Sequence, residues 1–336
     1  MPPTYKDIQR MTGLSLATIS KHFNGGNVLA ANRAAIEEAA ADLGFRVNEV
    51  ARSLRTRRSG TVGVLLPALD NDFHLEVIAG VEAVLKDVGV SVVVVSSHTS
   101  AAGAAGAVDL LVDRRVDGII AVPGRHDGEP LRAAAARGLP VVLVDRLVSG
   151  LECDAVVLDN TGASAQVVRH LVEHGHREVA VVTGTPDVWT MRERLTGFRR
   201  AMRAAGLPVA REHVVRGPLT VRTGREAVHA LLAGERRPTA VYATNYELTL
   251  GAVVALNEAD VDVPGDVSLV GFDGEVVAQV ARPRTSVYVQ PVREIAREAA
   301  ELMRERLAGD GEGPAPRRRV LTGRFVPGGS VGPPRG

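Results

Sequence analysis

Apolar residues follow two different spacings along the chain, and the spacing changes near residue 60. Between residues 4 and 44 they recur three or four positions apart, which is the repeat of one face of an α-helix. From residue 61 onward, short continuous apolar runs alternate with longer amphipathic stretches. Such alternation is typical of parallel sheets that helices cover on both faces. The pattern predicts a small all-helical head and a doubly wound α/β core long enough for two lobes.

The first helix of the head is predicted to begin just after Thr4. Thr4 is a good N-cap residue, and Asp7 places an acid in the first helical turn. Ile8 and Met11, three positions apart, are expected to form the apolar face. Gly13 ends this helix, because glycine accepts the left-handed conformation of a tight turn.

A second helix is predicted over residues 16–24, after the capping residue Ser15. Its inner face is Ile19 and Phe23, and its outer face is small or polar: Ala17, Ser20, Lys21 and Asn24. A third amphipathic stretch places Ile36, Ala40 and Leu43 on one stripe. Two helices joined through a glycine turn, the second with a polar and basic outer face, describe a helix-turn-helix that binds DNA. The alternative is an ordinary three-helix bundle, in which that outer face has no role beyond solvation.

A short helix is predicted over residues 48–56, where Asn48 is a suitable N-cap and Glu49 suits the positive helix end. Alone it is too short to be stable in water. Its aliphatic residues Val50 and Leu54 are crowded by arginines at positions 52, 55, 57 and 58. We expect this hinge helix to fold on DNA, with Leu54 wedged between base steps of the minor groove. A simple charged linker is the alternative.

In the core, polar residues follow the predicted strands. The apolar runs cover residues 61–67, 91–96, 116–122, 140–144, 155–158, 178–183, 213–215, 239–242 and 267–270. Ligands of open α/β sheets bind at the carboxyl ends of the strands. The residues to inspect there are Asp70, Asp72, Phe73, Ser97, His98, Asp145, Arg146, Thr185, Trp189, Asn245, Asp273 and Gln290, with Arg194 inside a following helix. Carboxylates, amides, one guanidinium and scarce aromatic rings suit a hydroxyl-rich ligand.

Composition and charge exclude several classes of protein. The net charge is +1, yet residues 1–60 hold nine Lys/Arg and five Asp/Glu, whereas the remainder hold 31 and 34. A basic head on an acidic body is expected of a nucleic-acid-binding module. Cys153 is the only cysteine, which excludes a disulfide framework and a zinc site of several thiolates. Apolar runs are too short to span a membrane, and the N-terminus lacks the apolar segment of a secretory signal, so we expect a cytoplasmic protein.

Catalytic motifs are not apparent in the sequence. No predicted strand is followed by a glycine-rich phosphate loop, and there is neither a G-x-S-x-G elbow nor an H-E-x-x-H helix. His170, His174 and His176 lack a carboxylate or cysteine that would complete a metal site, and we interpret them as surface histidines. We therefore expect no enzymatic activity, no metal and no cofactor.

Several stretches in a fixed order resemble the LacI–GalR family of bacterial transcription regulators, over essentially the whole chain. They are YKDIQRMTGLSLATISK (5–21), NEVARSLRT (48–56), VDGII (116–120), DN (159–160), HGHREVA (174–180), RLTGF (194–198), RPTAVYATN (237–245) and VPGDVSLVGFD (263–273). The resemblance implies a helix-turn-helix head, a hinge helix and a two-lobed core similar to periplasmic sugar-binding proteins. It also implies a homodimer on a palindromic double-stranded operator, with a small effector, expected to be a sugar or related polyol, in the interlobe cleft.

The resemblance assigns roles to individual residues. Leu16, Ala17 and Lys21 match base-reading positions, and Leu54 matches the leucine that opens the central operator step. The DNA-contacting residues that we predict are Thr4, Ser15, Leu16, Ala17, Thr18, Ser20, Lys21, Asn24, Ala51, Leu54 and Arg55. The effector-contacting residues that we predict are Asp72, Phe73, His74, Asp145, Arg146, Trp189, Arg194, Asn245, Asp273 and Gln290.

Four positions depart from the family's pattern. Lys21 stands where many members have arginine, so a point donor replaces a bidentate guanine contact. Val47 replaces the proline before the hinge, Leu29 replaces a polar cap of the third helix, and Tyr246 replaces an acid after Asn245. The tail has no leucine heptad, so a dimer is expected rather than a tail-built tetramer.

These readings divide the chain into a head at residues 1–46, a hinge at 47–59 and a core at 60–336. Within the core we assign residues 60–160 and 291–322 to the first lobe, and 161–290 and 323–336 to the second. A periplasmic-type solute-binding protein without a DNA role would share the core, and it is the alternative that the basic head and missing signal argue against. An α/β enzyme that uses the cleft is a further alternative.

Overall fold

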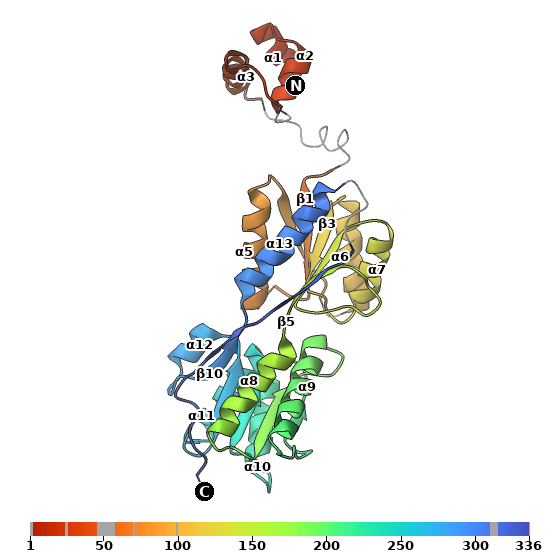
Figure 1. The fold of residues 1–336 in the computed structure, drawn as a ribbon. Helices are drawn as coiled ribbons and strands as arrows, with labels where there is room; N and C mark the ends of the chain where they lie inside the picture. The colour runs from red at the N-terminus through yellow and green to blue at the C-terminus, as the bar shows by residue number, and fades with distance from the viewer. Residues whose placement is uncertain are drawn as a thin grey trace. The chain divides into compact units, whose positions relative to one another are not determined.

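The computed structural model describes residues 3–23, 26–45, 58–69, 71–98, 100–309 and 315–335. The chain divides into two compact units, Met1–Gly60 and Thr61–Gly336, whose helices and strands are drawn in Figure 1. Each unit has its own hydrophobic core.

Within residues 3–23 and 26–45, the first unit contains three helices: α1 (Tyr5–Thr12), α2 (Leu16–Phe23) and α3 (Ala30–Asp42). One fully buried isoleucine from each helix, Ile8, Ile19 and Ile36, forms the centre of the core. The rings of Tyr5, Phe23 and Phe45 close it, with centroids 5.1–5.5 Å apart. The prediction of three helices is confirmed.

The structure of the head differs from the sequence prediction at Met11 and agrees with it at the start of α1. Met11 is half exposed, so its assignment to the apolar face of α1 is wrong, because the three isoleucines and the aromatic cluster already fill the small core. The α1 start is as predicted: the Asp7 carboxylate accepts hydrogen bonds from the Thr4 backbone N–H (2.7 Å) and hydroxyl (2.8 Å). Leu29 precedes α3 without a side-chain cap and is exposed.

The second unit holds two six-stranded sheets, each the centre of one lobe (Figure 1). The sheet of lobe 1 has the order β11-β5-β4-β3-β1-β2, and all its pairs are parallel. Its strands are β1 (Thr61–Leu66), β2 (Ser91–Ser96), β3 (Gly118–Ala121), β4 (Val141–Val144), β5 (Asp154–Leu158) and β11 (Arg318–Leu321).

The sheet of lobe 2 has the order β12-β10-β9-β8-β6-β7. It is parallel except for β12, which is antiparallel to β10. Its strands are β6 (Val179–Thr183), β7 (Val214–Arg216), β8 (Ala240–Ala243), β9 (Ser268–Phe272), β10 (Ser286–Val289) and β12 (Arg324–Val326).

Helices cover both faces of each sheet, as the continuous apolar strands predicted. On lobe 1, α5 (Asp72–Lys86) and α13 (Val292–Ala308) cover one face, and α6 (Ala101–Asp113) and α7 (Gly128–Ala136) cover the other. On lobe 2 the two pairs are α8 (Asn160–Glu173) with α9 (Trp189–Ala204), and α10 (Val221–Ala233) with α11 (Tyr246–Glu258). A short helix, α12 (Glu275–Val280), follows β9.

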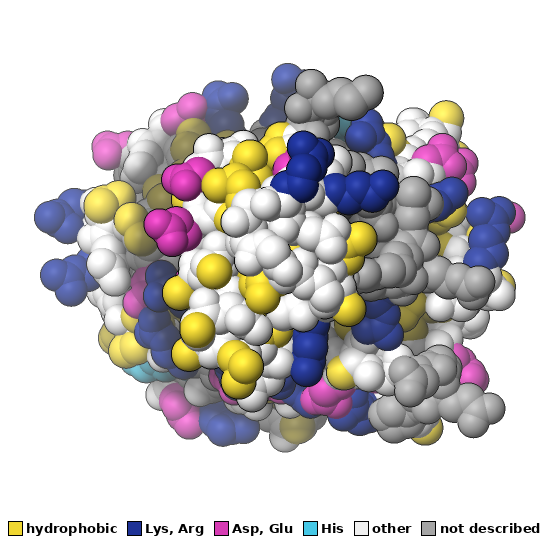
Figure 2. All heavy atoms as spheres, turned by 90° about the horizontal axis from the view of Figure 1, so that it is seen from above, with side chains coloured by type: hydrophobic (Ala, Val, Ile, Leu, Met, Phe, Trp, Pro, Cys, Tyr) yellow, Lys and Arg dark blue, Asp and Glu magenta, His cyan; other side chains and the backbone are white. Residues whose placement is uncertain are grey.

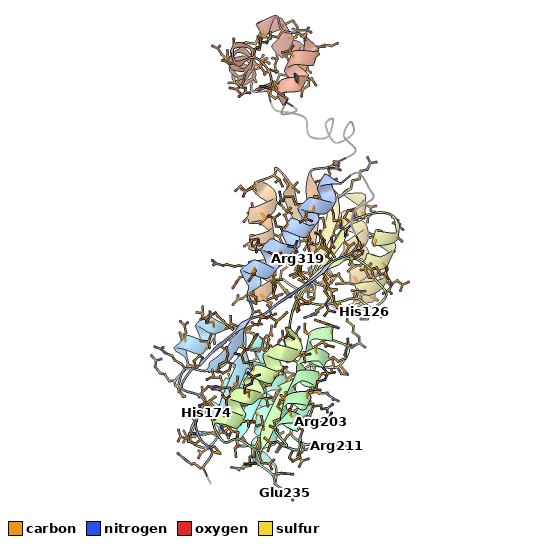
Figure 3. All side chains as sticks on the ribbon, in the orientation of Figure 1. His126, His174, Arg203, Arg211, Glu235 and Arg319 are labelled. Carbon is orange, nitrogen blue, oxygen red and sulfur yellow. The ribbon has the colours of Figure 1, made fainter. Side chains whose placement is uncertain are left out.

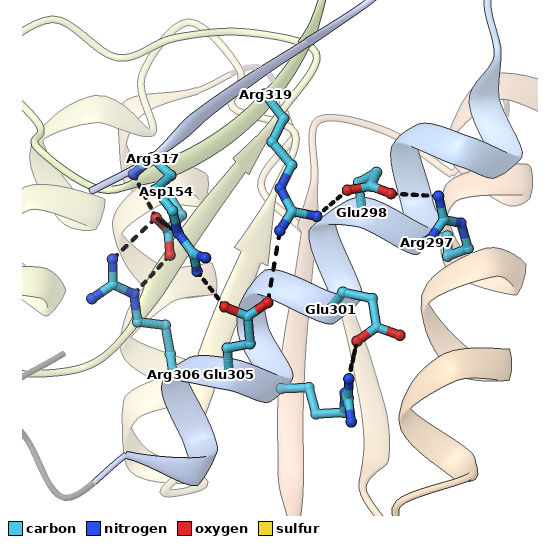
Figure 4. Close-up of polar contacts among 9 residues, drawn as sticks. Asp154, Arg297, Glu298, Glu301, Glu305, Arg306, Arg317 and Arg319 are labelled. Carbon is cyan, nitrogen blue, oxygen red and sulfur yellow. Dashed lines mark hydrogen bonds and ion pairs between the residues drawn. The ribbon is translucent and has the colours of Figure 1, made fainter. Parts of the chain in front are cut away.

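An ion-pair network anchors the C-terminal return to lobe 1 (Figure 4). The buried Asp154 carboxylate on β5 accepts two hydrogen bonds from Arg306 of α13 (2.7 and 3.0 Å) and one from the Arg317 backbone N–H (2.7 Å). Burial would raise the pKa of Asp154, but these hydrogen bonds lower it below its usual value. Glu305 of α13 pairs with Arg317 at 2.6 Å and with Arg319 of β11 at 3.7 Å. The network fixes the edge strand β11, which has no apolar run of its own.

No helix among the described residues is long and apolar enough to cross a bilayer. On the face drawn in Figure 2, basic and acidic side chains are interspersed, in keeping with a net charge of +1.

Candidate functional site

Helix α2 presents the residue set predicted to read DNA. Gly13, with φ at +71°, makes the turn before it, and the Ser15 hydroxyl accepts a hydrogen bond from the Thr18 N–H at 3.1 Å. Because Ile19 is buried, the opposite side of the helix is outward: Leu16, Ala17 and Lys21 are exposed. Thr18 and Ser20 are partly exposed, and Thr4 is exposed. Asn24, Ala51, Leu54 and Arg55 lie outside the described residues, as does the hinge helix.

The predicted ligand residues of the core gather where the strands of both sheets end. Asp145 follows β4 of lobe 1, whereas Asp273 follows β9 and Gln290 follows β10 of lobe 2. Arg194, in the second turn of α9, interacts electrostatically with both carboxylates. The two sheets therefore place two acids, one guanidinium and one amide together at the interlobe boundary.

Arg194 is rigidly held and buried. Its Nε donates to Asn160 Oδ1 at 2.8 Å, and its Nη1 donates to the Thr244 carbonyl at 2.6 Å. The guanidinium carbon lies 3.5 Å from the centre of the Phe272 ring, so a cation–π contact supports it from one side. Burial lowers the pKa of Arg194, while Asp273 and Asp145 raise it. Because these contacts already fix the guanidinium group, its remaining N–H groups can donate to a ligand with little further loss of side-chain conformational entropy.

Asp273 is held by Gln290. The Gln290 side-chain amide donates to Asp273 Oδ2 at 2.7 Å, and the Gln290 backbone N–H donates to Oδ1 at 3.1 Å. Burial raises the pKa of Asp273 to about 6, against the lowering effects of Arg194 and of both hydrogen bonds, and with a further raising effect of Asp145. The ionised carboxylate is thus poorly solvated when no ligand is present.

Two buried acceptors of this cluster lack a hydrogen-bond partner in the part of the chain that the structure describes. They are Asp145 Oδ1 and Gln290 Oε1. Arg146 donates to the other Asp145 oxygen at 3.3 Å. A buried acceptor without a donor is costly, so each of these two atoms would be stabilised by a hydrogen bond from an added donor. A ligand with several hydroxyl groups supplies such donors.

The backbone is strained at both acids. Asp145 has φ at +66° and Asp273 has φ at +61°, values that side chains other than glycine, asparagine and aspartate rarely adopt. Each residue directly follows a buried strand. Such strain persists only where the surrounding structure fixes it, and it is common at ligand sites.

The starts of two helices meet across the lobes. Asn71 caps α5 by accepting from the Phe73 N–H at 2.9 Å, and Asn245 caps α11 by accepting from the Leu248 N–H at 3.0 Å. The amide groups of both asparagines donate to one carboxylate, Glu247, with Asn71 at 2.6 Å from Oε1. The side chain of Asn245, which is predicted to bind effector, therefore uses its oxygen and one of its two N–H groups within the protein.

The remaining predicted ligand residues surround this cluster. On α5, His74 is buried, Phe73 is partly buried with its ring centre 5.8 Å from that of His74, and Asp72 is exposed. Trp189 begins α9, and Arg318 of β11 lies over its ring at 5.6 Å. A further contact between the lobes joins Arg125 to Asp187 at 3.4 Å.

Sequence reasoning missed three residues of this region: Asn160, Glu247 and Arg318. Asn160 comes just after strand β5, at the same kind of position as the residues that were chosen, so the strand-end rule could have found it. Glu247 and Arg318 reach the site through contacts between segments 176 and 129 positions apart, which no local pattern encodes.

The described residues contain no group of three or more histidine, cysteine or acidic side chains arranged to hold a metal ion. His176 bonds to Thr239 and Ser268 and is buried, so its assignment as a surface histidine is wrong: both of its ring nitrogens have hydroxyl partners inside lobe 2. The rings of His170 and His174 are tilted by 51° to one another, with their centres 4.4 Å apart.

Comparisons with known proteins agree with this architecture. A sequence model of the periplasmic binding protein-like domain matches residues 168–331. Catabolite control protein A of Priestia megaterium is 30% identical over 305 residues, which cover 90% of this chain and 92% of that protein. The HTH-type transcriptional repressor PurR of Photobacterium profundum is 29% identical over 307 residues, covering 90% and 92%.

Among solved structures, the complex of the transcriptional regulator CelR with cellobiose superposes with a TM-score of 0.76 at 28% identity, over 98% of this chain and 99% of that one. The Lac repressor dimer bound to operator and an anti-inducer gives a TM-score of 0.85 at 23% identity, over 99% and 100%, which shows a shared fold.

Proposed function

Because this chain belongs to the LacI–GalR family of bacterial transcription regulators, we propose that it represses transcription as a dimer on a palindromic operator and is switched by a polyhydroxylated ligand in the interlobe cleft. The observation that carries the ligand chemistry is a pair of buried acceptors without a hydrogen-bond partner among the described residues, Asp145 Oδ1 and Gln290 Oε1, beside the guanidinium of Arg194.

The DNA-binding part of the proposal is supported by α2. On its exposed face, the aliphatic Leu16 suits contact with a thymine methyl group in the major groove. The small Ala17 lets the helix backbone come close to the bases, and the cationic Lys21 can donate to an acceptor on a base edge. A single head contacts few phosphates, so two heads are needed for useful affinity. A dimer with twofold symmetry reads two inverted half-sites, which is why the operator is expected to be palindromic.

The donors and acceptors of the inner cluster indicate which chemical groups a ligand should carry. Arg194 offers donors, whereas Asp145, Asp273 and Gln290 offer acceptors from two different lobes. A hydroxyl group both donates and accepts, so neighbouring hydroxyls can satisfy both kinds of group at once. Cellobiose, bound by CelR, has this chemistry. An apolar or purely cationic ligand would leave either the donors or the acceptors unpaired.

Switching follows from the placement of the ligand groups. A ligand that contacts Asp145 of lobe 1 and Arg194 of lobe 2 stabilises one angle between the lobes over others. That difference in affinity between arrangements is the free energy available to change operator binding.

The test is Arg194→Ala, with Arg194→Lys as a milder variant and Arg200→Ala as a control on the exposed side of the same helix. A thermal-shift screen with sugars, polyols and nucleosides first identifies a ligand. Operator DNA is taken from the region upstream of the protein's own gene, and affinity is titrated with and without that ligand.

We expect Arg194→Ala to lose the ligand response while its ligand-free operator affinity stays within a few-fold of wild type, because Arg194 belongs to the core and not to the head. The control should respond like wild type. If both Arg194 variants fold, as judged by their melting curves, and still show the full ligand-induced change, the cleft is not the sensing site.

A further inference from the structure

A cavity opens beside the inner cluster of Asp145, Asp273, Arg194 and Gln290, between lobe 1 and lobe 2. It has a volume of about 670 Å³, within the range of small-molecule sites. Its walls are the segments that follow β3, β4 and β6, including Pro123–Gly124, Arg146–Ser149 and Asp187–Trp189. Arg146 joins this outer cavity to the inner cluster, because it also donates to Asp145 at 3.3 Å. Figure 3 labels His126, one of its lining residues, at the end of lobe 1 that faces lobe 2.

The lining of the outer cavity is cationic. Four arginines contribute to it, Arg125, Arg132, Arg146 and Arg192, against two carboxylates, Glu129 and Asp187. Arg125 pairs with Asp187 at 3.4 Å, Arg146 with Asp145 at 3.3 Å and Arg192 with its neighbour Glu193 at 3.7 Å. Arg132 forms no ion pair within the described residues, and it donates to the Ser149 carbonyl at 2.9 Å. An excess of positive charge around a concave site attracts anions.

Two helix N-termini end at the same cavity, and neither is capped by a side chain. Helix α7 begins at Gly128, but its N-cap residue Asp127 instead accepts from the Gly124 N–H at 2.6 Å and the Ser97 hydroxyl at 3.0 Å. Helix α9 begins at Trp189 after Val188, which has no capping group. The first-turn N–H groups and the helix dipoles of both helices therefore add positive potential to that of the arginines.

We infer that the outer cavity binds an anionic substituent, a phosphate or a carboxylate, of the polyhydroxylated ligand whose hydroxyl groups occupy the inner cluster. This inference rests on the proposed function and narrows its ligand to a sugar phosphate or a sugar acid. The sugar ring meets the acceptors of Asp145 and Gln290, while the anionic group lies among the guanidinium groups and the two helix ends. Trp189 lines the cavity, and its ring, over which Arg318 lies at 5.6 Å, is the aromatic group available to pack against the sugar ring.

The test uses the full-length protein and its own fluorescence, because Trp189 is the only tryptophan of the chain and lines the cavity. The protein is titrated with hexose 6-phosphates, hexuronates and the matching free hexoses, and with inorganic phosphate, at low and high salt. Comparing the affinities for hexose 6-phosphates and hexuronates shows whether the cavity prefers a phosphate or a carboxylate. We expect at least one anionic sugar to bind about tenfold or more tightly than its neutral parent, with a preference that shrinks as salt rises.

Paired double variants with equal loss of charge provide the control. Arg132→Ala/Arg192→Ala removes two guanidinium groups from the cavity, and we expect it to reduce the preference for the anionic sugar to less than about twofold. Arg200→Ala/Arg203→Ala removes two exposed arginines from the later turns of α9, with Arg203 roughly 17 Å along the axis from Arg192, and should keep the preference (Figure 3).

Equal binding of anionic and neutral sugars by the wild-type protein would overturn the inference, as would an undiminished preference in the cavity variant. If neutral polyols bind and change operator affinity while the anionic group adds nothing, only the inference fails. If no sugar of either kind changes the fluorescence or the operator affinity of protein that still binds operator, the proposed ligand function fails with it.

Discussion

Asp145 and Asp273 have closely similar places in the two lobes. Each follows a buried strand, each has a left-handed backbone, and both interact with the single guanidinium of Arg194. Burial raises the pKa of Asp273, and the Asp145 carboxylate raises it further, whereas Arg194 and the two hydrogen bonds from Gln290 lower it. Keeping the Asp273 carboxylate ionised in this buried place therefore has an electrostatic cost, which additional hydrogen-bond donors would lower.

This cost predicts an unusual pH dependence. Because folding raises the pKa of Asp273 from 3.8 to about 6, the folded protein binds this proton more tightly than the unfolded chain. The contribution of Asp273 to stability is full at acidic pH and is lost as the pH rises through about 6. We expect the wild-type protein to gain about 1 kcal/mol relative to Asp273→Asn between pH 7 and pH 5.

The measurement is urea unfolding of both proteins at a series of pH values, and only their difference is interpreted, since histidines titrate in the same window. If the difference in the free energy of unfolding between wild type and Asp273→Asn stays constant, or if wild type gains stability as the pH rises, the pKa of Asp273 is not raised by its surroundings.

Lys21 is predicted to contact a base edge, and comparing specific with random DNA distinguishes such a contact from one to a phosphate. A lost base contact costs about 1–3 kcal/mol on the specific sequence and nothing on random DNA. We expect Lys21→Ala to weaken operator binding much more than binding to a random duplex, measured by fluorescence anisotropy. Lys6→Ala, also exposed but on α1, should weaken both alike. If Lys21→Ala lowers the affinity for both duplexes equally, Lys21 does not read a base.

At the scale of elements, the contact between α5 and α11 joins the lobes through their helix caps. Each cap asparagine uses its oxygen to accept from its own helix and its NH₂ group to donate to Glu247. One carboxylate thus holds the start of a helix in each lobe. A bond of this kind contributes about 0.5–1.5 kcal/mol, enough to bias an equilibrium between two lobe angles by several-fold.

Glu247→Ala tests this bridge without any ligand. We expect faster hydrogen exchange at the first turns of both α5 and α11, by about two- to tenfold, since both caps lose a partner that fixes the asparagine side chain. Exposed Glu226→Ala on α10 serves as the control and should change neither helix. A response confined to α11 would mean that the carboxylate does not hold lobe 1.

At the scale of the whole molecule, the head and the core have separate hydrophobic cores, so the residues predicted to read DNA and those predicted to bind a ligand belong to units built around different residues. Removing residues 1–58 should leave a folded core that still dimerises and binds the ligand but does not bind operator. Size-exclusion chromatography, Trp189 fluorescence and a gel shift measure the three properties. Full operator affinity in the truncated protein would place DNA binding elsewhere.

The sequence by itself determined the secondary structure of the head and most strands of the core. Runs such as residues 61–66 and 179–183 are continuous and apolar because parallel strands are buried on both faces, and this local signal needs no knowledge of the fold. Strand-end chemistry likewise pointed to Asp145, Asp273 and Gln290, since parallel strands bring their carboxyl ends to one edge. The charge of Lys21 and its helical spacing from Ile19 indicated which face of α2 is outward.

The tertiary structure alone decided how these residues act together. The pairing of β11 with β5 depends on Asp154, Arg306 and Arg317, which are far apart in sequence, so an arginine-rich strand without an apolar run escaped prediction. The bridge from Asn71 to Glu247 and the cationic outer cavity arise only when two lobes meet. Local periodicity reports the burial of a segment, whereas the pKa of Asp273, the unmet acceptors and the charge of a cavity depend on which distant groups that burial brings together.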